Sequence, residues 1–387
     1  MSKAGGKNTK AQPVTACPSQ TLPHKSPDRT ASLGTFLAAM SSPVRFALAG
    51  FGAWGRFHAQ SIAGHPEAQL VAISAPSEAS RQLARQLYPQ AQVFADSLEL
   101  IAQADFDILD VVTPSHTHRE IALAAIEKGK HLLLEKPMAI TLEDCRAIVT
   151  AAQARGVHLA VGHELRLSSQ WGEIKNIIER GTIGQPQYVL VELSRKPYRN
   201  GAEGWRYDPE RVGSWVLEEP IHFFDLARWY LESSGNPIEL QAYANSRDPQ
   251  RPTLYDNFSA MFRYANGSYA VVSQTLAAFE HHQTVKVSGT QGALWAGWSG
   301  ALDRTLEPTA FLKVFDGNTL ETVPLARQSG EVFELREEIA QCIDMVRHGT
   351  RPIATGQDGL WSAGLCLLAE SSIRQHRPLP LHDLHLP

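Results

Sequence analysis

Short apolar stretches alternate with segments of helical periodicity in the part of the chain that follows residue 43. Residues 44–49 are almost entirely apolar, and a helix-compatible segment follows at 56–64. The same alternation predicts further strands at 70–73, 108–112, 131–134 and 158–161, and further helices at 78–87, 118–128 and 142–155. Strands and helices that alternate at this length are typical of a doubly wound parallel sheet. We therefore expect an α/β fold whose first domain covers residues 43–163.

The pattern changes after Gly162, where consecutive strands joined by turns replace the alternation. Helical periodicity is found at 171–179, 222–231, 334–348 and 360–376. Strand patterns lie at 187–193, 240–244, 258–264, 268–277, 284–287 and 311–315, with turn signals such as Asn266-Gly267 between them. These features predict a second, α+β domain over residues 164–387 with a predominantly antiparallel open sheet.

The first 42 residues differ from the rest of the chain. They are rich in Lys, Ser, Thr, Pro and Gly and lack apolar periodicity as far as Arg29, so we expect a disordered tail over residues 1–42. Met40 stands directly before the first strand and is a candidate for the true start of translation. The apolar stretch 33–40 is too short for a secretion signal with its cleavage site, which favours a cytoplasmic protein.

Composition narrows the class of partner. A chain of 387 residues with 20% charged residues and a net charge of −4 has no basic surplus for nucleic acid. No apolar run is long enough to span a membrane. The four cysteines are scattered without a CxxC pair, and the closely spaced histidines at 116, 118, 281 and 282 lack a third ligand, so we expect neither a disulfide framework nor a metal site. A small-molecule partner is the expectation.

A glycine motif follows the first predicted strand. In Gly50-Phe51-Gly52-Ala53-Trp54-Gly55, the first glycine permits a tight turn, the second lets the backbone approach a pyrophosphate, and the third allows close packing of helix on strand. The helix N-terminus then faces the anion. Because a strand precedes the motif and a helix follows it, we predict a Rossmann domain that binds a dinucleotide.

The second predicted strand lacks the acidic residue that would take the ribose hydroxyls of NAD. Ser74, Ser77 and Arg81 follow it instead, and they offer hydrogen-bond donors for a 2′-phosphate. We therefore expect NADP to be preferred over NAD. The alternative is that Glu78 replaces the missing acid and Arg81 is an ordinary helix residue.

Polar residues also follow two other strands of the predicted parallel sheet. Thr113-Pro114 leads to His118 after one strand, and Glu135-Lys136-Pro137 follows the next. Ligands bind at the carboxyl ends of such strands. A Glu and a Lys that emerge from a buried strand need partners, either in a structural ion pair or in a functional site.

Together these features resemble one enzyme family. The strand and glycine loop from Val44 to Gly55, the Thr113-Pro114 turn, Glu135-Lys136-Pro137 and Glu218-x-x-x-His222-x-x-Asp225 are similar to the glucose-fructose oxidoreductase, inositol dehydrogenase and MocA (Gfo/Idh/MocA) family. The resemblance implies that Lys136 reaches the oxygen of the reacting carbon and that Glu135 lies by the nicotinamide ribose. It also implies cofactor contacts at Thr113, Pro114 and His118 and a cis bond before Pro137.

The second domain departs from the pattern of this family. Glu218 stands where relatives have Asp, and Trp215 and Pro220 replace small residues. On one helix Glu218 and His222 would share a face, although Pro220 suggests that the helix starts near it. Four further candidates for substrate contact are equally compatible with a scaffold role: His163, Arg166, Trp205 and Arg206. The first two follow the last Rossmann strand, where relatives often contact substrate or cofactor, and the other two precede the second motif. Trp215 is also a candidate for substrate contact, because its ring could stack on a sugar ring or belong to the core.

These residues predict an NAD(P)-dependent oxidoreductase that transfers hydride between nicotinamide and a carbinol or carbonyl carbon of a sugar, cyclitol or related polyol. His222 is the candidate acid/base because imidazole titrates near neutrality. Lys136 would stabilise alkoxide charge, and Glu218 would orient one of the two. Rival interpretations are a hydrolase or lyase with transient oxidation and a non-catalytic dinucleotide sensor. The resemblance also implies a homo-oligomer, a dimer or tetramer formed through the open sheet of the second domain.

Overall fold

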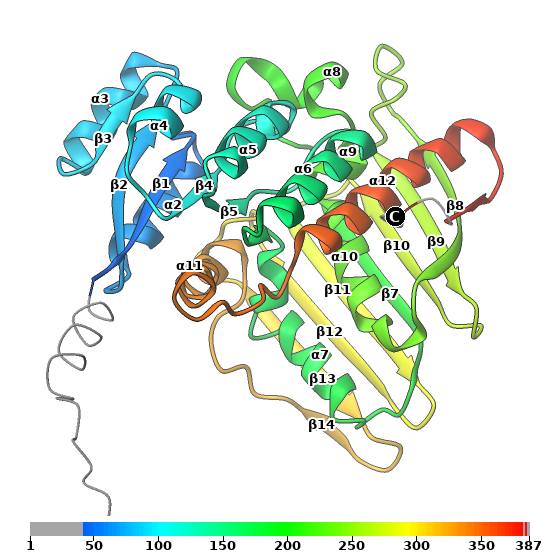
Figure 1. The fold of residues 1–387 in the computed structure, drawn as a ribbon. Coiled ribbons are helices and arrows are strands. Elements are labelled where there is room, and N and C mark those ends of the chain that lie inside the picture. Colours follow the sequence, from blue (N-terminus) through cyan, green and yellow to red (C-terminus); the bar gives the residue numbers. More distant parts are fainter. Residues whose placement is uncertain (1–41, 382–383, 385–387) are drawn as a thin grey trace, which may run out of the picture. The chain divides into compact units, whose positions relative to one another are not determined.

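The computed structural model describes residues 42–381 and 384, and two sheets organise them (Figure 1). The tail predicted over residues 1–42, with Met40, lies outside the described residues except for Ser42. The described residues from Pro43 onward form one compact unit, so both sheets belong to it. The domain boundary predicted between residues 163 and 164 falls directly before the short helix η2 (Glu164–Leu167) and stays a prediction.

The first sheet has six parallel strands in the order β3-β2-β1-β4-β5-β6. The strands are β1 (Val44–Ala49), β2 (Ala68–Ser74), β3 (Gln92–Phe94), β4 (Ile108–Val111), β5 (His131–Leu134) and β6 (Leu159–Val161). The helices between them are α2 (Gly55–Gly64), α3 (Glu78–Leu87), α4 (Ser97–Gln103), α5 (His118–Glu127) and α6 (Leu142–Arg155). The strand order reverses between β1 and β4, which is where open α/β sheets bind ligands. The predicted doubly wound sheet is confirmed.

Strand β1 shows why these strands read as apolar runs. Phe46 and Leu48 pack on one side of the sheet with Ile62 of α2, whereas Ala47 packs on the other side with Ile121 of α5. Both faces are therefore buried, as is usual for parallel sheets. Burial of each large side chain is worth roughly 1.5–3 kcal/mol relative to exposure.

The second sheet has nine strands in the order β14-β13-β12-β11-β7-β10-β9-β8-β15. Its strands are β7 (Pro186–Arg195), β8 (Pro237–Asn245), β9 (Asn257–Tyr264), β10 (Tyr269–Thr275), β11 (His281–Gly289), β12 (Ala293–Gly300), β13 (Thr309–Phe315), β14 (Leu320–Thr322) and β15 (Leu379–Pro380). All neighbouring pairs are antiparallel except β7 and β10, which are parallel. The predicted antiparallel α+β part is thus confirmed, with one parallel pair added.

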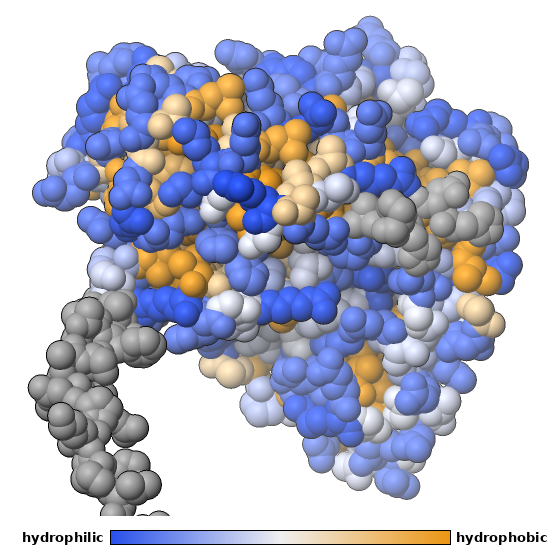
Figure 2. All heavy atoms as spheres, viewed as in Figure 1, coloured by the Kyte–Doolittle hydropathy of each residue, from blue (hydrophilic) through white to orange (hydrophobic). Residues whose placement is uncertain are grey.

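Helices cover one face of this second sheet (Figure 1). They are α7 (Trp171–Glu179), α10 (Pro220–Tyr230) and α12 (Gly356–Gln375), while α11 (Glu331–His348) packs on α2. Shorter helices connect these elements: η1 (Ser115–Thr117), η3 (Ala202–Tyr207), α8 (Pro209–Val212), α9 (Trp215–Glu218) and η4 (Glu232–Ser234). Hydrophilic residues cover most of the face shown in Figure 2, with hydrophobic residues in separate patches. Among residues 42–381, no helix combines the length and apolar character needed to cross a membrane.

Candidate active site and dinucleotide site

The glycine loop joins β1 to α2 at the reversal of the strand order. A Cβ atom on Gly55 would lie 1.9 Å from the carbonyl oxygen of Gly50, so the helix can approach the loop only with glycine there. A Cβ atom on Gly52 would meet no protein atom within 4 Å. The first turn of α2 carries no acidic residue that would repel an anion. The loop thus has the open space and the helix N-terminus that a pyrophosphate needs.

Trp54 connects this loop to the end of β5 and to the second sheet. Its indole Nε1 donates a hydrogen bond to Oε1 of Glu135 at 2.8 Å. The guanidinium of Arg304, from the segment between β12 and β13, lies over the indole ring with Cζ 4.5 Å from its centroid. The dinucleotide loop is therefore connected to elements of both sheets.

Lys136 stands two residues after the end of β5, at the same edge of the first sheet. The bond between Lys136 and Pro137 is cis, as the family resemblance implies. Lys136 Nζ donates to the backbone carbonyl of Glu218 at 2.9 Å. Burial alone would lower the pKa of this ammonium, but nearby carboxylates, chiefly those of Glu218 and Glu135, give a net rise. Lys136 is therefore a charged, half-buried ammonium group.

His222 lies in the first turn of α10 and is buried. Its Nδ1 atom is 3.6 Å from Oε2 of Glu164 and has no hydrogen-bond partner among the described residues. Burial, reinforced by the positive charge of Lys136 and by the neighbouring imidazole of His163, lowers the pKa of His222 well below its ordinary value. The structure thus brings Lys136 and His222 into one electrostatic site and makes His222 a neutral imidazole at neutral pH.

Glu218 does not orient His222 as the sequence pattern suggested. Helix α9 ends at Glu218 and α10 begins at Pro220, so the two side chains do not lie along one helix. The carboxylate of Glu218 pairs with Nε of Arg206, so it acts on Lys136 through its charge, while the main-chain carbonyl of Glu218 accepts the hydrogen bond from Lys136. The break before Pro220 explains the difference, because proline at the first helical position starts a new helix.

The aromatic residues beside Arg206 form a small apolar cluster. The indole Nε1 of Trp215 donates to the carbonyl of Arg206 at 2.8 Å, and the Trp215 ring packs edge-on against Tyr198 and Tyr207. Trp205 lies under the Arg206 guanidinium, 4.8 Å from Cζ to the ring centroid. Trp215 is thus part of the scaffold that holds Arg206, and Trp205 and Arg206 lie together.

Two further candidates follow β6 and differ from each other. His163 accepts or donates a 2.8 Å hydrogen bond at Nε2 with Ser362 of α12, and its Nδ1 is buried without a described partner. The centroids of the His163 and His222 rings are 5.7 Å apart. Arg166 instead makes two 2.7 Å hydrogen bonds to Asp225 and one to the Ile353 carbonyl. These contacts place His163 beside the site and assign Arg166 to the scaffold.

Sequence comparison identifies the family. The model of an oxidoreductase family with an NAD-binding Rossmann fold matches residues 44–163, and that of the GFO/IDH/MocA C-terminal domain matches residues 171–295. A 1,5-anhydro-D-fructose reductase of Ensifer adhaerens is 30% identical over 282 residues, which cover 72% of this chain and 81% of that protein. The chain belongs to the GFO/IDH/MocA oxidoreductase family. The resemblance drawn from the sequence motifs is thereby confirmed.

Other members of the GFO/IDH/MocA family are similar over nearly the whole length. A myo-inositol 2-dehydrogenase of Thermotoga maritima is 25% identical over 347 residues, covering 88% of this chain and 99% of that protein. A solved levoglucosan dehydrogenase, in complex with NADH and levoglucosan, is 21% identical and superimposes with a TM-score of 0.78 over 88% of this chain and 100% of that chain. The structural likeness shows the fold alone.

Three residues at the end of β2 and at the start of α3 were predicted to bind a cofactor phosphate, and most of their polar atoms already contact the protein. Ser74 is buried, and its Oγ lies 2.8 Å from that of Ser97, so it faces into the protein. Ser77 caps α3 by accepting from the Ser80 amide. Arg81 donates to the Ala75 carbonyl at 2.9 Å and to Glu78 at 2.6 and 3.0 Å. Ser77 and Arg81 thus lie at the junction of β2 and α3, where Glu78 pairs with Arg81, and their contact with a cofactor phosphate stays a prediction.

The turn after β4 is fixed by His118. One ring nitrogen lies 2.8 Å from the Thr113 carbonyl and the other 3.0 Å from the Pro137 carbonyl. The ring is fully buried, and burial lowers its pKa. His118 thus joins the turn of Thr113 and Pro114 to the segment after Lys136, and its contacts are those of a scaffold residue behind the cofactor edge.

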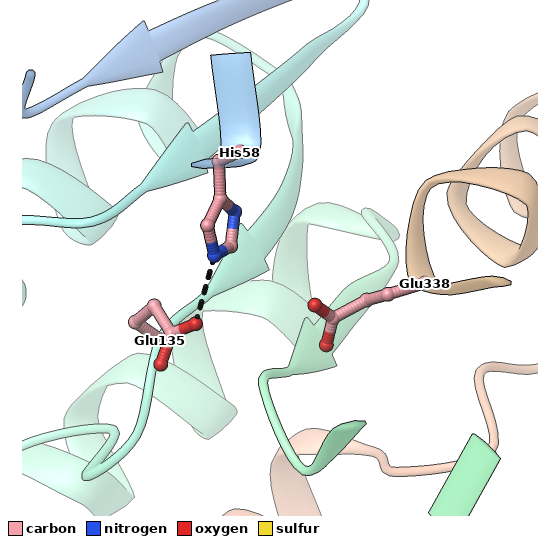
Figure 3. Close-up of side chains that lie close together, drawn as sticks. All are labelled: His58, Glu135 and Glu338. Atoms are coloured by element: carbon pink, nitrogen blue, oxygen red, sulfur yellow. Dashed lines mark hydrogen bonds and ion pairs between the residues drawn. The ribbon is translucent and has the colours of Figure 1, made fainter. Parts of the chain in front are cut away.

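Sequence reasoning missed several buried ionisable residues beside the site. Glu164 follows β6, and burial raises its pKa well above the usual value. His58 of α2 and Glu338 of α11 were also missed. Together with the predicted Glu135 they are buried and place potential ligand atoms within 4.8 Å of one another (Figure 3). One signal for His58 was available in the sequence, namely a histidine on the apolar face of a predicted helix. The acids gave none, because Glu164 and Glu338 reach the site only through tertiary packing.

Proposed function

We propose that this chain transfers hydride between a nicotinamide dinucleotide and a carbinol or carbonyl carbon of a sugar, cyclitol or related polyol. The single observation that carries the proposal is the charged Lys136 on the sheet edge that also carries the glycine loop. Its Nζ atom lies 2.9 Å from the Glu218 carbonyl oxygen, and its charge lowers the pKa of His222. Relatives named as inositol, anhydrofructose and levoglucosan enzymes support the class of substrate.

The bound nicotinamide would supply or accept the hydride, and the glycine loop with Trp54 would hold the dinucleotide. The chain's own residues handle the proton and the charge. Lys136, whose pKa is raised, would donate a hydrogen bond to the substrate oxygen and stabilise negative charge that develops on it. His222, whose pKa is lowered, would accept the hydroxyl proton during oxidation and return it during reduction.

We assign the recognition of further hydroxyl groups to residues around His222. The Nδ1 atom of His163 is buried and unpartnered within the described part of the chain, so a substrate hydroxyl would satisfy it. Arg206 and Trp205 lie beyond Glu218, where a guanidinium stacked on an indole would present donors to a sugar-like ring. Trp215 and Arg166 support these groups and stay outside the proposed contacts.

We propose NADP as the preferred cofactor, NAD being the alternative. Arg81 lies at the end of β2 with its guanidinium anchored to the Ala75 carbonyl, in the place where a 2′-phosphate would come. Glu78 pairs with Arg81 and would compete with that phosphate. The three described cysteines, Cys145, Cys342 and Cys366, are buried free thiols, which suits the cytoplasmic location that we propose.

A substrate screen tests the proposed function. The full-length protein is offered inositols, aldoses and anhydrosugars with NADP⁺ or NAD⁺, and the absorbance of reduced nicotinamide is followed. We expect turnover of at least one polyol, loss of it in Lys136→Met, and retention in the control Lys128→Met, whose side chain is exposed at the end of α5. Substrate consumption without net nicotinamide reduction would favour transient oxidation. Dinucleotide binding without turnover of any compound would favour a sensor.

A further inference from the structure

Through its Oε1 atom, Glu135 also belongs to a buried charge cluster that the proposed chemistry does not use. His58 of α2 is fully buried, and its Nδ1 lies 2.8 Å from Oδ2 of Asp110, an interior residue of β4. Its Nε2 lies 3.1 Å from Oε1 of Glu135 (Figure 3). One imidazole thus bridges two carboxylates that come from neighbouring strands.

The contacts fix the charge of each group. Burial alone would lower the pKa of His58, but the two carboxylates raise it well above its ordinary value. Burial would raise the pKa of Glu135, but the hydrogen bond and charge of His58, with help from Lys136 and Trp54, lower it to about 2. His58 is therefore an imidazolium and Glu135 a carboxylate.

Helix α11 closes the cluster from the other side. Glu338 is buried, its Oε2 has no partner among the described residues, and burial together with the charge of Glu135 raises its pKa well above the usual value. Cys342, one turn further along α11, is also buried and has a raised pKa. Glu338 and Cys342 are thus neutral, and the ionic contacts of His58 come from Asp110 and Glu135.

We propose that His58 is a positioning residue of the cofactor site: clamped by Asp110, it keeps Glu135 in one rotamer and one charge state, with Oε2 left to serve the dinucleotide and Lys136. This inference rests on the proposed function, in which Glu135 faces the nicotinamide ribose. Oε1 of Glu135 is already occupied by Trp54 and His58, whereas Oε2 accepts, within the described part of the chain, from the amide of Lys136. A protonated Glu135 would lose an acceptor site and would no longer help to keep Lys136 charged.

A divalent cation between His58, Glu135 and Glu338 is the competing interpretation of the same atoms. It would require His58 to bind through a bare Nε2 while Nδ1 donates to Asp110. The indole donor on Oε1 of Glu135 and the neighbouring ammonium of Lys136 disfavour a second positive centre there. We therefore favour a protonated His58 over a bound metal ion, and the test includes a measurement of metal content.

The test compares wild type, His58→Gln and the packing control Cys342→Ala, which removes a buried side chain of α11 without changing a charge. In the cofactor-free protein, NMR of the imidazole nitrogens should show His58 doubly protonated from about pH 6 to about pH 8, where an ordinary histidine titrates. Affinity for NAD⁺, which lacks the titrating 2′-phosphate of NADP⁺, should be nearly independent of pH over this range in wild type and in Cys342→Ala. In His58→Gln it should fall about tenfold or more as pH decreases, because Glu135 then gains a proton.

Asp110→Asn keeps the test decisive if His58→Gln does not fold, because loss of the Asp110 charge should move the His58 titration back toward neutrality. A neutral His58 imidazole in wild type, or a flat pH profile in His58→Gln, would overturn the proposal. So would one equivalent of tightly bound metal whose removal by chelator abolishes dinucleotide binding. Absence of polyol turnover together with the expected binding profiles would refute the proposed function and leave the role of His58 standing.

Discussion

The pKa values of Lys136 and His222 are shifted in opposite directions, and this separates their roles. Lys136→Ala should lower kcat by about 10²–10³-fold, because it removes charge stabilisation made only in the transition state, and should leave dinucleotide affinity nearly unchanged. His222→Ala should lower kcat by about 10²–10⁴-fold, the usual contribution of an acid/base. Glu218→Gln should have a smaller effect, since the carbonyl that holds Lys136 remains. Steady-state kinetics on the substrate found by screening measures all three.

The pH profile provides a separate check on His222. Its folded-state pKa lies well below 6.5, so in the oxidation direction activity should fall only as pH decreases through that lowered value, where the imidazole gains a proton and can no longer accept one. In His222→Ala this acidic limb should flatten. An unchanged profile with near-wild-type turnover would make His222 a core residue and leave proton transfer to Glu164 or water.

Sequence reasoning reached those site residues that motifs encode and missed those that tertiary packing supplies. The glycine loop and Lys136 were predictable because each follows a recognisable strand. The partner of His222 was not, since Glu164 and Glu218 are equally acidic in sequence and only the break before Pro220 decides which one lies near the imidazole. The same holds for Ser74, whose inward orientation depends on Ser97.

The junction between β2 and α3 is the element on which cofactor choice depends. If Arg81 binds a 2′-phosphate, Arg81→Ala should weaken NADP⁺ binding about tenfold or more, because a hydrogen bond to a charged group contributes roughly 1.5–3 kcal/mol, and should leave NAD⁺ binding nearly unchanged. Titration of both cofactors into each variant measures this. Tighter binding of NAD⁺ by wild type, lost in Glu78→Ala, would assign the ribose to Glu78 and reverse the preference.

At the scale of elements, long periodic segments were predictable and short or glycine-rich ones were not. Helices α3, α6 and α7 have the predicted bounds. Strand β3 has three residues, too few for a periodic signal, and the following helix α4 was missed with it. Strand β12, with the sequence ALWAGWSG, was missed because small residues stand on both of its faces and hide the alternation.

The open face of the second sheet concerns the whole molecule. Along β13, buried Leu312 and Val314 alternate with exposed Phe311 and Phe315, and Trp295 of β12 is 48% exposed. Further large side chains continue this face, namely Tyr243, Met261 and Tyr269. The predicted alternation of inward and outward residues is present, but apolar side chains stand on both faces of the sheet. An exposed apolar surface of this extent is typical of a protein–protein interface.

We therefore predict that the chain forms a homo-oligomer in which two copies bury this face against each other. Trp295→Glu combined with Phe311→Glu should dissociate the assembly, because it replaces two aromatic side chains of the buried face with charged carboxylates that would have to lose their water on association. The control is Leu87→Glu, which adds the same charge at a residue that is 52% exposed on α3, far from the second sheet in the fold. Sedimentation or light scattering across a range of protein concentrations measures the molar mass. A wild type that stays monomeric at all concentrations, or a double variant with unchanged mass, would contradict the prediction. The glycine loop and Lys136 belong to the first sheet, so the dissociated variant should still bind dinucleotide, and loss of binding would show instead that the oligomer is needed to complete the site.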